Sequence, residues 1–347
     1  MGRYREGAAS RHLPDKSGGH GLRPLTFVSL MCLYPRLLPN KKYLPNKKNN
    51  YNPPACPDER LRYVPIKCGE CIECRKAEAR EWRVRLEQEY INSEIPAKFV
   101  TLTFNKETYE TWIKTAKTEN EGATLLVRRF LERWRKETGK SVRHWLITEK
   151  GEDYARLHLH GLLWTTENEK TISEKWSYGF CYVGNYVNNK TINYITKYIT
   201  KKDTKHPEFK GKKFVSAGIG RGYNTEQAYH NYIPNKTNDH IRLSNGQKIA
   251  MPIYYRNKAF TEDERELLWL EKIDKNERYI RGIKFDMNKT DDVRRFWDVL
   301  QREQDRSREL GYGGLKKEWS VQNYGKTLEK LQYSKKENTF AHGNSDT

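Results

Sequence analysis

The chain has 347 residues and a formal net charge of +20, from 65 Lys and Arg against 45 Asp and Glu. This excess favours nucleic acid as a partner, although a basic surface that binds nothing is the alternative. Hydrophobic residues make up only 36%, whereas aromatic residues reach 12%, which is typical of a modest core with rings that stack on bases. No stretch of 18 apolar residues occurs, which excludes a membrane-spanning helix, and we expect no signal peptide.

Composition divides the chain into four parts. We expect a disordered basic arm over residues 1–30, a cysteine-containing segment and helix over 31–98, a core over 99–255 and a charged, mainly helical region over 256–347. The arm is rich in Arg, Gly, Ser and His and has no hydrophobic periodicity. More ordered sequence begins at Met31, which we interpret as a true or ancestral start. Six prolines between residues 36 and 67 predict loop there.

Hydrophobic periodicity predicts the elements of the core. After Cys74, one helical face carries Ala79, Trp82, Leu86 and Tyr90. In chain order there follow a strand over 99–104, a helix over 122–138, strands over 143–149 and 157–164, a short helix over 168–176, a strand over 180–183 and a helix over 190–202. A short charged turn with Gly151 and Asp153 predicts an antiparallel hairpin between the two middle strands. We therefore expect an α+β fold, an antiparallel sheet of about four or five strands flanked by helices, with a charged helical tail.

Two histidines share one face of the strand over 157–164. Residues two apart on a strand point the same way, so His158 and His160 present their imidazoles together while the neighbouring leucines face the other side. Such a pair can hold one divalent cation, and Glu149, at the end of the preceding strand, is the candidate third ligand. The alternative is a pair of hydrogen-bonded strand histidines without a metal. Burying two imidazoles among apolar residues has a cost that favours a functional role.

A repeated Tyr-x-x-Lys motif lies on the helix over 190–202. Tyr194 and Tyr198 are four residues apart and therefore one turn apart on the same face, with Lys197 and Lys201 three residues after each. A free tyrosine has a pKa near 10 and is a weak nucleophile, so a nearby ammonium group and a metal-bound phosphate would favour its phenolate. The alternative is a basic amphipathic helix whose tyrosines pack or stack on DNA.

Three cysteines with two-residue gaps, Cys68, Cys71 and Cys74, precede the first long helix. Closely spaced thiols of this kind suit a zinc or an iron–sulfur site, and the alternative is free thiols in a reducing cytosol. The fourth ligand of a structural Zn²⁺ is open between Cys32 and Cys56. Cys181 lies on a predicted strand, and we expect it to be a buried thiol.

Basic side chains surround these motifs. We expect phosphate contacts from Arg128, Arg129, Arg133 and Arg135 on one helix, and from Lys201, Lys202 and Lys205 after the tyrosines. A solvated charged face is the alternative for each of them.

The motifs, in their order along the chain, resemble the HUH endonucleases, and more closely the replication initiation proteins of the gokushovirus group of Microviridae phages. The matching segments are MCLYPRL, CGECIEC, FVTLTF, ITEKGE, RLHLHGLLW, TINYITKYITKK, GIGRGY and MPIYYRNKAFTEDE. The resemblance covers roughly residues 31–275, and its most specific parts are the His-x-His strand and the paired tyrosines.

The resemblance implies an HUH-type, RRM-like core that nicks and transfers single-stranded DNA in rolling-circle replication. It implies Mg²⁺ or Mn²⁺ at His158 and His160, with Glu149 completing the site, and a covalent 5′-phosphotyrosine on Tyr194 or Tyr198. Lys197 or Lys201 would protonate the leaving oxygen or steady its charge. The family's opening MC motif favours Cys32 as the fourth ligand of a structural Zn²⁺.

The implied partners are single-stranded and supercoiled phage origin DNA, together with a host helicase and DNA polymerase, in the cytoplasm of a bacterial host. Two other functions stay open at this point. One is a relaxase or single-strand transposase of the same superfamily. The other is a non-catalytic, zinc-dependent nucleic-acid-binding protein in which the histidines and tyrosines are structural.

Overall fold

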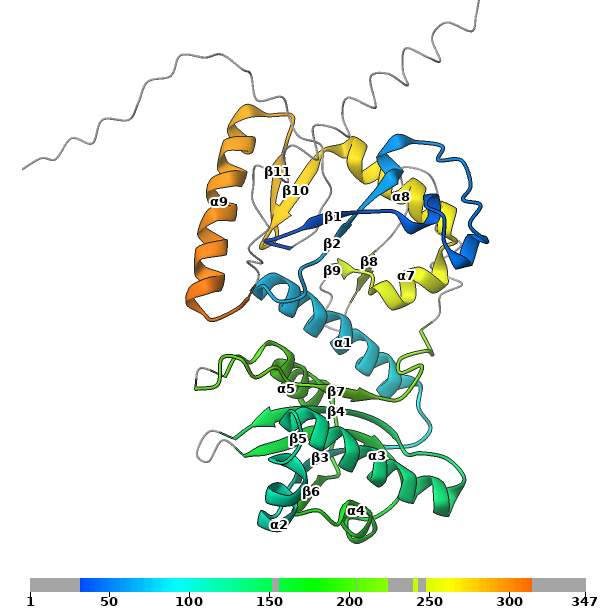
Figure 1. Cartoon of the computed structure of the whole chain (residues 1–347), viewed down its shortest axis with the longest axis vertical. Helices are drawn as coiled ribbons and strands as arrows, with labels where there is room; N and C mark the ends of the chain where they lie inside the picture. Colours follow the sequence, from blue (N-terminus) through cyan, green and yellow to red (C-terminus); the bar gives the residue numbers. More distant parts are fainter. Residues whose placement is uncertain (1–31, 152–155, 204, 224–239, 243–247, 314–347) are drawn as a thin grey trace, which may run out of the picture.

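The computed structural model describes residues 32–151, 156–203, 205–223, 240–242 and 248–313 (Figure 1). The basic arm over 1–30, Met31 as a start, Asp153 of the hairpin turn and residues 314–347 of the expected tail lie outside the described residues. Within these described ranges, none of the helices combines the length and the apolar character that crossing a bilayer requires.

A five-stranded antiparallel sheet forms the centre of the fold, which confirms the predicted α+β class. Its strand order is β6-β3-β5-β4-β7. The strands are β3 (Ala97–Thr103), β4 (Arg143–Lys150), β5 (Leu157–Trp164), β6 (Cys181–Gly184) and β7 (Lys213–Val215). The first four were predicted to within two residues at each end. β7 was missed, because it has only three residues and pairs with β4 across a long gap in sequence.

One face of the sheet is covered by α3 (Glu119–Thr138) and α4 (Glu169–Trp176), as Figure 1 shows. Leu126, Phe130 and Trp134 of α3 are buried against it, as their spacing predicted. The helix begins three residues earlier than predicted because the hydroxyl of Thr118 accepts the backbone N–H of Glu121 and caps it. The short helix α2 (Lys106–Thr108) and a π-helical turn over Tyr109–Ile113 precede it.

The opposite face is covered by α5 (Asn189–Thr200) and α1 (Ile72–Asn92), which also pack against each other. Ile192, Ile195 and Ile199 of α5 form a buried stripe together with Leu86 of α1 and the sheet. Of the face predicted for α1, Leu86 is buried and Ala79 and Trp82 pack against this core. Tyr90 is exposed, because the last turn of α1 extends past the edge of the core. This face of the sheet is the one that carries both histidines.

Glu89 joins three parts of this core. From α1, its carboxylate accepts hydrogen bonds from the guanidinium of Arg143 on β4 and from the backbone N–H of Gly220. Burial by itself raises the pKa of Glu89, but these hydrogen bonds outweigh burial and hold the pKa below its usual value. The carboxylate therefore stays ionised and fixes α1 to the sheet and to the turn that follows β7.

A second group of elements lies on the other side of α1 (Figure 1). It contains β1 (Arg36–Pro39) with β2 (Tyr63–Ile66), β8 (His240–Arg242) with β9 (Lys248–Ala250), β10 (Glu277–Ile280) with β11 (Ile283–Asp286), and the helices α7 (Ile253–Ala259), α8 (Glu262–Lys275) and α9 (Thr290–Glu309). Each strand pair is a two-stranded antiparallel sheet.

Two expectations for these regions need correction. The proline-rich stretch over 36–67 is not all loop, since β1 and β2 pair there and three short 3₁₀ turns accompany them. Prolines are compatible with a two-stranded sheet because every strand in it is an edge. The described part of the C-terminal region is helical, as expected, but a β-hairpin (β10 and β11) separates α8 from α9. On α8, Leu268 and Ile273 are buried, whereas Leu267 is exposed.

Candidate active site

The β4–β5 pairing brings an acidic residue beside the two histidines. Glu149 lies directly opposite His158 in the antiparallel register, and His160 follows two residues along the same face. The Oε2 atom of Glu149 is 3.1 Å from Nε2 of His160 and 3.5 Å from Nε2 of His158. One candidate ligand atom from each of the three residues lies within 4.8 Å of the others. This donor set of two imidazoles and one carboxylate suits a single divalent cation with open coordination positions.

The other ring nitrogen of each histidine is held by the protein. Nδ1 of His160 is 3.0 Å from the hydroxyl of Thr101, and Nδ1 of His158 is 3.2 Å from the carbonyl oxygen of Arg156. In metal sites, hydrogen bonds of this kind orient the imidazole ring and leave the Nε2 lone pair available to the cation. Thr101 had no assigned role in the sequence. Its position opposite His160 follows from the β3–β5 register, and the alternation of the FVTLTF strand already placed it on one face.

His158, His160 and Glu149 form a trio, and a lysine from α5 contacts its carboxylate. Nζ of Lys201 is 2.5 Å from Oε1 of Glu149. Burial by itself raises the pKa of Glu149, but hydrogen bonds from His158, His160 and Lys201 outweigh it and hold the pKa well below the usual value. Glu149 is therefore ionised across the physiological pH range and can act as an anionic ligand.

Both tyrosines of α5 reach the histidine strand. The ring of Tyr198 stacks on the imidazole of His160, with ring centroids 4.6 Å apart and planes inclined by 10°. The Tyr198 hydroxyl lies 2.5 Å from that of Tyr194, to which it donates a hydrogen bond. Tyr194 packs its ring edge against Phe99 and is 50% exposed. The two phenols predicted as nucleophiles therefore lie together beside the trio of candidate metal ligands.

The lysines predicted to act with the tyrosines have different positions. Lys201 lies next to the trio, with Nζ 6.0 Å from the ring centroid of Tyr198. Lys197 is exposed one turn earlier on α5. Lys202 donates a hydrogen bond to the carbonyl oxygen of Pro207, and Lys205 is exposed in the segment that follows. The structure thus places Lys201 against the trio and directs Lys202 toward the segment that follows α5.

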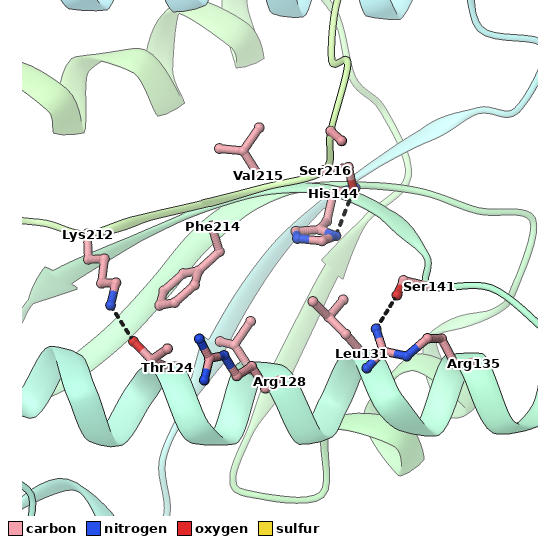
Figure 2. A pocket seen from close by; sticks show the side chains of 12 residues that line it. Thr124, Arg128, Leu131, Arg135, Ser141, His144, Lys212, Phe214, Val215 and Ser216 are labelled. Atoms are coloured by element: carbon pink, nitrogen blue, oxygen red, sulfur yellow. Dashed lines mark hydrogen bonds between the residues drawn. The ribbon is translucent and has the colours of Figure 1, made fainter. Parts of the chain in front are cut away.

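The arginines of α3 lie on the opposite layer of the fold from the histidines. Arg133 donates hydrogen bonds to the last carbonyls of α4, and Arg129 stacks on Trp112. Arg128 and Arg135 line a groove of about 490 Å³ between α3 and β7. Figure 2 shows their side chains, with Lys212 at the other end of the groove. Contact of these arginines with DNA stays a prediction, and such contact would use the face of the sheet away from the trio.

Four cysteines come together at the start of α1. One sulfur from each of Cys32, Cys68, Cys71 and Cys74 lies within 4.8 Å of the others. Cys56 is outside this group, and its thiol contacts the carbonyl oxygen of Asp58 instead. Of the two fourth ligands considered, the geometry therefore favours Cys32. Cys181 is buried in the core of the α3 face of the sheet, as expected.

The fold and the trio define an antiparallel α+β core with a candidate metal-ligand set faced by a tyrosine helix. Residues 97–203, from β3 to just beyond α5, match the family model described as Replication-associated protein ORF2/G2P. No match is found among curated proteins or among solved structures. The family match confirms the resemblance to replication initiators of small single-stranded DNA phages and supports a role in the initiation of DNA replication. The matched segment contains every residue of the trio and both tyrosines.

Proposed function

We propose that the chain is a metal-dependent endonuclease and strand transferase that starts rolling-circle replication by nicking single-stranded DNA. The observation that carries the proposal is the stacking of Tyr198 on His160, with centroids 4.6 Å apart, beside the trio of His158, His160 and Glu149. A nucleophile next to a cation site is what phosphoryl transfer needs, because most of its catalysis is positioning and charge stabilisation.

The reaction follows from these groups. A bound Mg²⁺ or Mn²⁺ would supply charge stabilisation at the non-bridging oxygens of the scissile phosphate. The phenolate oxygen of a tyrosine attacks phosphorus in line and forms the P–O bond of a 5′-phosphotyrosine, while the bond from phosphorus to the 3′ oxygen breaks. The leaving 3′ oxygen takes up a proton and becomes a hydroxyl that primes synthesis. His158, His160 and Glu149 would hold the ion, and Thr101 fixes the imidazole that stacks on Tyr198.

Two tyrosines allow the cycle to be repeated. Their hydroxyls are within hydrogen-bond distance of each other, so either phenol can reach a phosphate bound at one place. After one round of synthesis, the free tyrosine would cut the regenerated origin. The released 3′ hydroxyl would then attack the first phosphotyrosine and close the displaced strand into a circle, which restores the first tyrosine.

Lys201 is the proposed charge-handling group. Its ammonium lies against Glu149 and near the face of the Tyr198 ring. When a cation binds Glu149 and replaces this ion pair, the ammonium can move to the phosphate. There it would stabilise the phenolate or protonate the leaving oxygen. We further propose that the DNA partner is a phage origin in single-stranded or supercoiled form, and that a host helicase and polymerase act in the cytoplasm of a bacterial host.

The test uses single-stranded oligonucleotides that tile the replicon carrying the gene, incubated with the full chain and Mn²⁺ and separated on a denaturing gel. We expect a covalent protein–DNA adduct that either Tyr194→Phe or Tyr198→Phe reduces and the double variant abolishes. Tyr186→Phe is the matched control, because Tyr186 is 93% exposed just before α5. It should form the adduct as the wild type does.

A binding module without catalysis predicts another result. Such a protein would shift the oligonucleotides on a native gel but form no adduct with Mg²⁺ or Mn²⁺. That outcome, with the wild-type chain folded and binding DNA, would refute the proposed nicking activity. An adduct that persists in the double tyrosine variant would refute the assigned nucleophiles.

A further inference from the structure

We propose that Cys32, Cys68, Cys71 and Cys74 bind one structural Zn²⁺ that fastens α9 and the N-terminal segment to the start of α1. This site is separate from the histidine trio and does not depend on the nicking activity. It is carried by the positions of the four sulfurs and by the contacts of the segments that supply them.

The sulfur geometry fits a single tetrahedral ion. The Sγ atoms of Cys68 and Cys74 are 3.8 Å apart. Zn–S bonds of about 2.3 Å at tetrahedral angles place two sulfurs about 3.8 Å apart. An iron–sulfur cluster would require wider separation, because several iron and sulfide atoms lie between its cysteine ligands, whereas these four ligand atoms all lie within 4.8 Å of one another. All four thiols are free of disulfides.

Backbone groups support the sulfurs as thiolates. The N–H of Cys68 points at the sulfur of Cys32 at 3.2 Å, that of Cys71 at the sulfur of Cys68 at 3.3 Å, and that of Leu33 at the sulfur of Cys71 at 3.5 Å. Hydrogen bonds to ligand sulfurs from the surrounding backbone are the usual outer shell of a thiolate metal site. Zn²⁺ binds cysteines as thiolates, and a cation among these four sulfurs would offset their mutual repulsion and hold them in this arrangement.

The ion would join segments that are far apart in sequence. The side-chain amide of Gln304 on α9 donates to the carbonyl oxygen of Leu33 at 2.6 Å, and the hydroxyl of Ser307 accepts the N–H of Ile72 at 3.2 Å. Phe296 and Leu300 of α9 are buried in the same cluster as the cysteines. The site therefore lies where the N-terminal segment, the start of α1 and α9 meet.

The connection continues to the nucleophile helix. Just beyond α9, the hydroxyl of Tyr312 donates to the carbonyl oxygen of Thr200, the last residue of α5, at 2.5 Å. An ion that holds α9 against α1 thus also fixes the residue that caps the end of α5. We expect loss of the metal to loosen α9 and the end of α5, and to leave the β4–β5 hairpin in place.

The first experiment measures metal content in the full chain, purified under reducing conditions from zinc-supplemented cells. Zinc could also enter the histidine site, so the background is the double variant His158→Ala, His160→Ala. In that background we expect one zinc per chain, retained in Cys56→Ser and lost in Cys68→Ser. Cys56 is the matched control because it is partly buried like Cys68 but lies outside the group. Zinc content unchanged by Cys68→Ser, or absent from a folded parent chain, would overturn the proposal.

A second measurement guards against a variant that fails to fold. The parent chain is stripped with a chelator, refilled with Co²⁺ and examined by visible absorption. We expect the intense bands of tetrahedral cobalt with sulfur-to-metal charge transfer, and a Tm that falls by more than about 5 °C on stripping and returns on refilling. Weak octahedral bands, or a Tm that does not respond to metal, would refute a tetrathiolate site. An iron spectrum in the chain as purified would refute zinc as the resident ion.

Discussion

Thr101 offers the sharpest test of the trio as a cation site, because its side chain contacts a candidate ligand through one hydrogen bond. When Nε2 of His160 binds a cation, its proton must sit on Nδ1, and the Thr101 hydroxyl, 3.0 Å away, accepts it. Thr101→Val keeps the shape of the side chain and suits a β-strand, but it removes this acceptor. The imidazole is then free to turn away from the cation.

The size of the effect follows from burial. His160 is 9% exposed, so water replaces the lost acceptor poorly, and a buried N–H without a partner costs about 1–3 kcal/mol. Since about 1.4 kcal/mol corresponds to a factor of ten, we expect Mn²⁺ affinity to fall about tenfold or more, as found for outer hydrogen bonds of metal ligands. The Tm should change little.

The assay is an Mn²⁺ titration followed by electron paramagnetic resonance of the free ion. Thr103→Val is the matched control, because Thr103 shares the strand and the face but donates to the carbonyl oxygen of Phe180 instead of contacting an imidazole. The control should bind Mn²⁺ as the wild type does. Equal affinity in Thr101→Val and the wild type would refute the view that this hydroxyl orients His160.

Three more outcomes follow from the structure. Glu89→Gln should lower the free energy of unfolding by about 1–3 kcal/mol near neutral pH. Hydrogen bonds from Arg143 and Gly220 outweigh burial and hold the pKa of Glu89 below its usual value, so the ionised carboxylate stabilises the fold above that usual pKa. In urea titrations, the difference between wild type and variant should vanish as the pH falls through the lowered pKa. Gly161→Ala should destabilise by about 3 kcal/mol in denaturant melts, because a Cβ there would lie 2.1 Å from the carbonyl oxygen of Trp145. Lys201→Met should bind Mn²⁺ at least as well as the wild type, since it removes a competitor for the carboxylate, but form the DNA adduct at least about tenfold more slowly.

Each of these variants has a control on the same kind of element. Glu87→Gln removes a carboxylate that pairs with Arg83 along α1 and should lower the free energy of unfolding by less than Glu89→Gln near neutral pH. Gly184→Ala places a Cβ at ordinary contact distance on β6 and should be tolerated. Lys190→Met removes an exposed charge from the start of α5 and should leave the adduct rate unchanged. A control that behaves like its partner would contradict the specific contact proposed.

Local patterns predicted the parts of the site that depend on one element. Alternation along β5 placed His158 and His160 on one face, and helical spacing placed Tyr194 beside Tyr198, because both periodicities are properties of the backbone alone. The charged turn led to the hairpin that carries Glu149. These features needed no knowledge of distant contacts.

Features that depend on pairing between distant segments were harder to predict. The hydrogen bond of Thr101 to His160 depends on which strand lies next to β5. β7 is three residues long and has no hydrophobic periodicity of its own. Arg133 illustrates the same limit for charge, since sequence pattern suggested phosphate contact while its guanidinium caps the end of α4. The resemblance to a family, and not spacing, selected Cys32 over Cys56.

The position of β5 in the sheet separates the site into parts of different mobility. β5 is hydrogen-bonded on both sides, to β3 and to β4, so its amides exchange with solvent only when the sheet itself opens. α5 is held by side-chain packing on one face and by its end contacts. The imidazoles therefore keep their arrangement through local fluctuations, whereas the phenols lie on a helix without such hydrogen bonds to neighbouring strands. In the cycle proposed above, the two tyrosines would exchange over a cation site that stays in place.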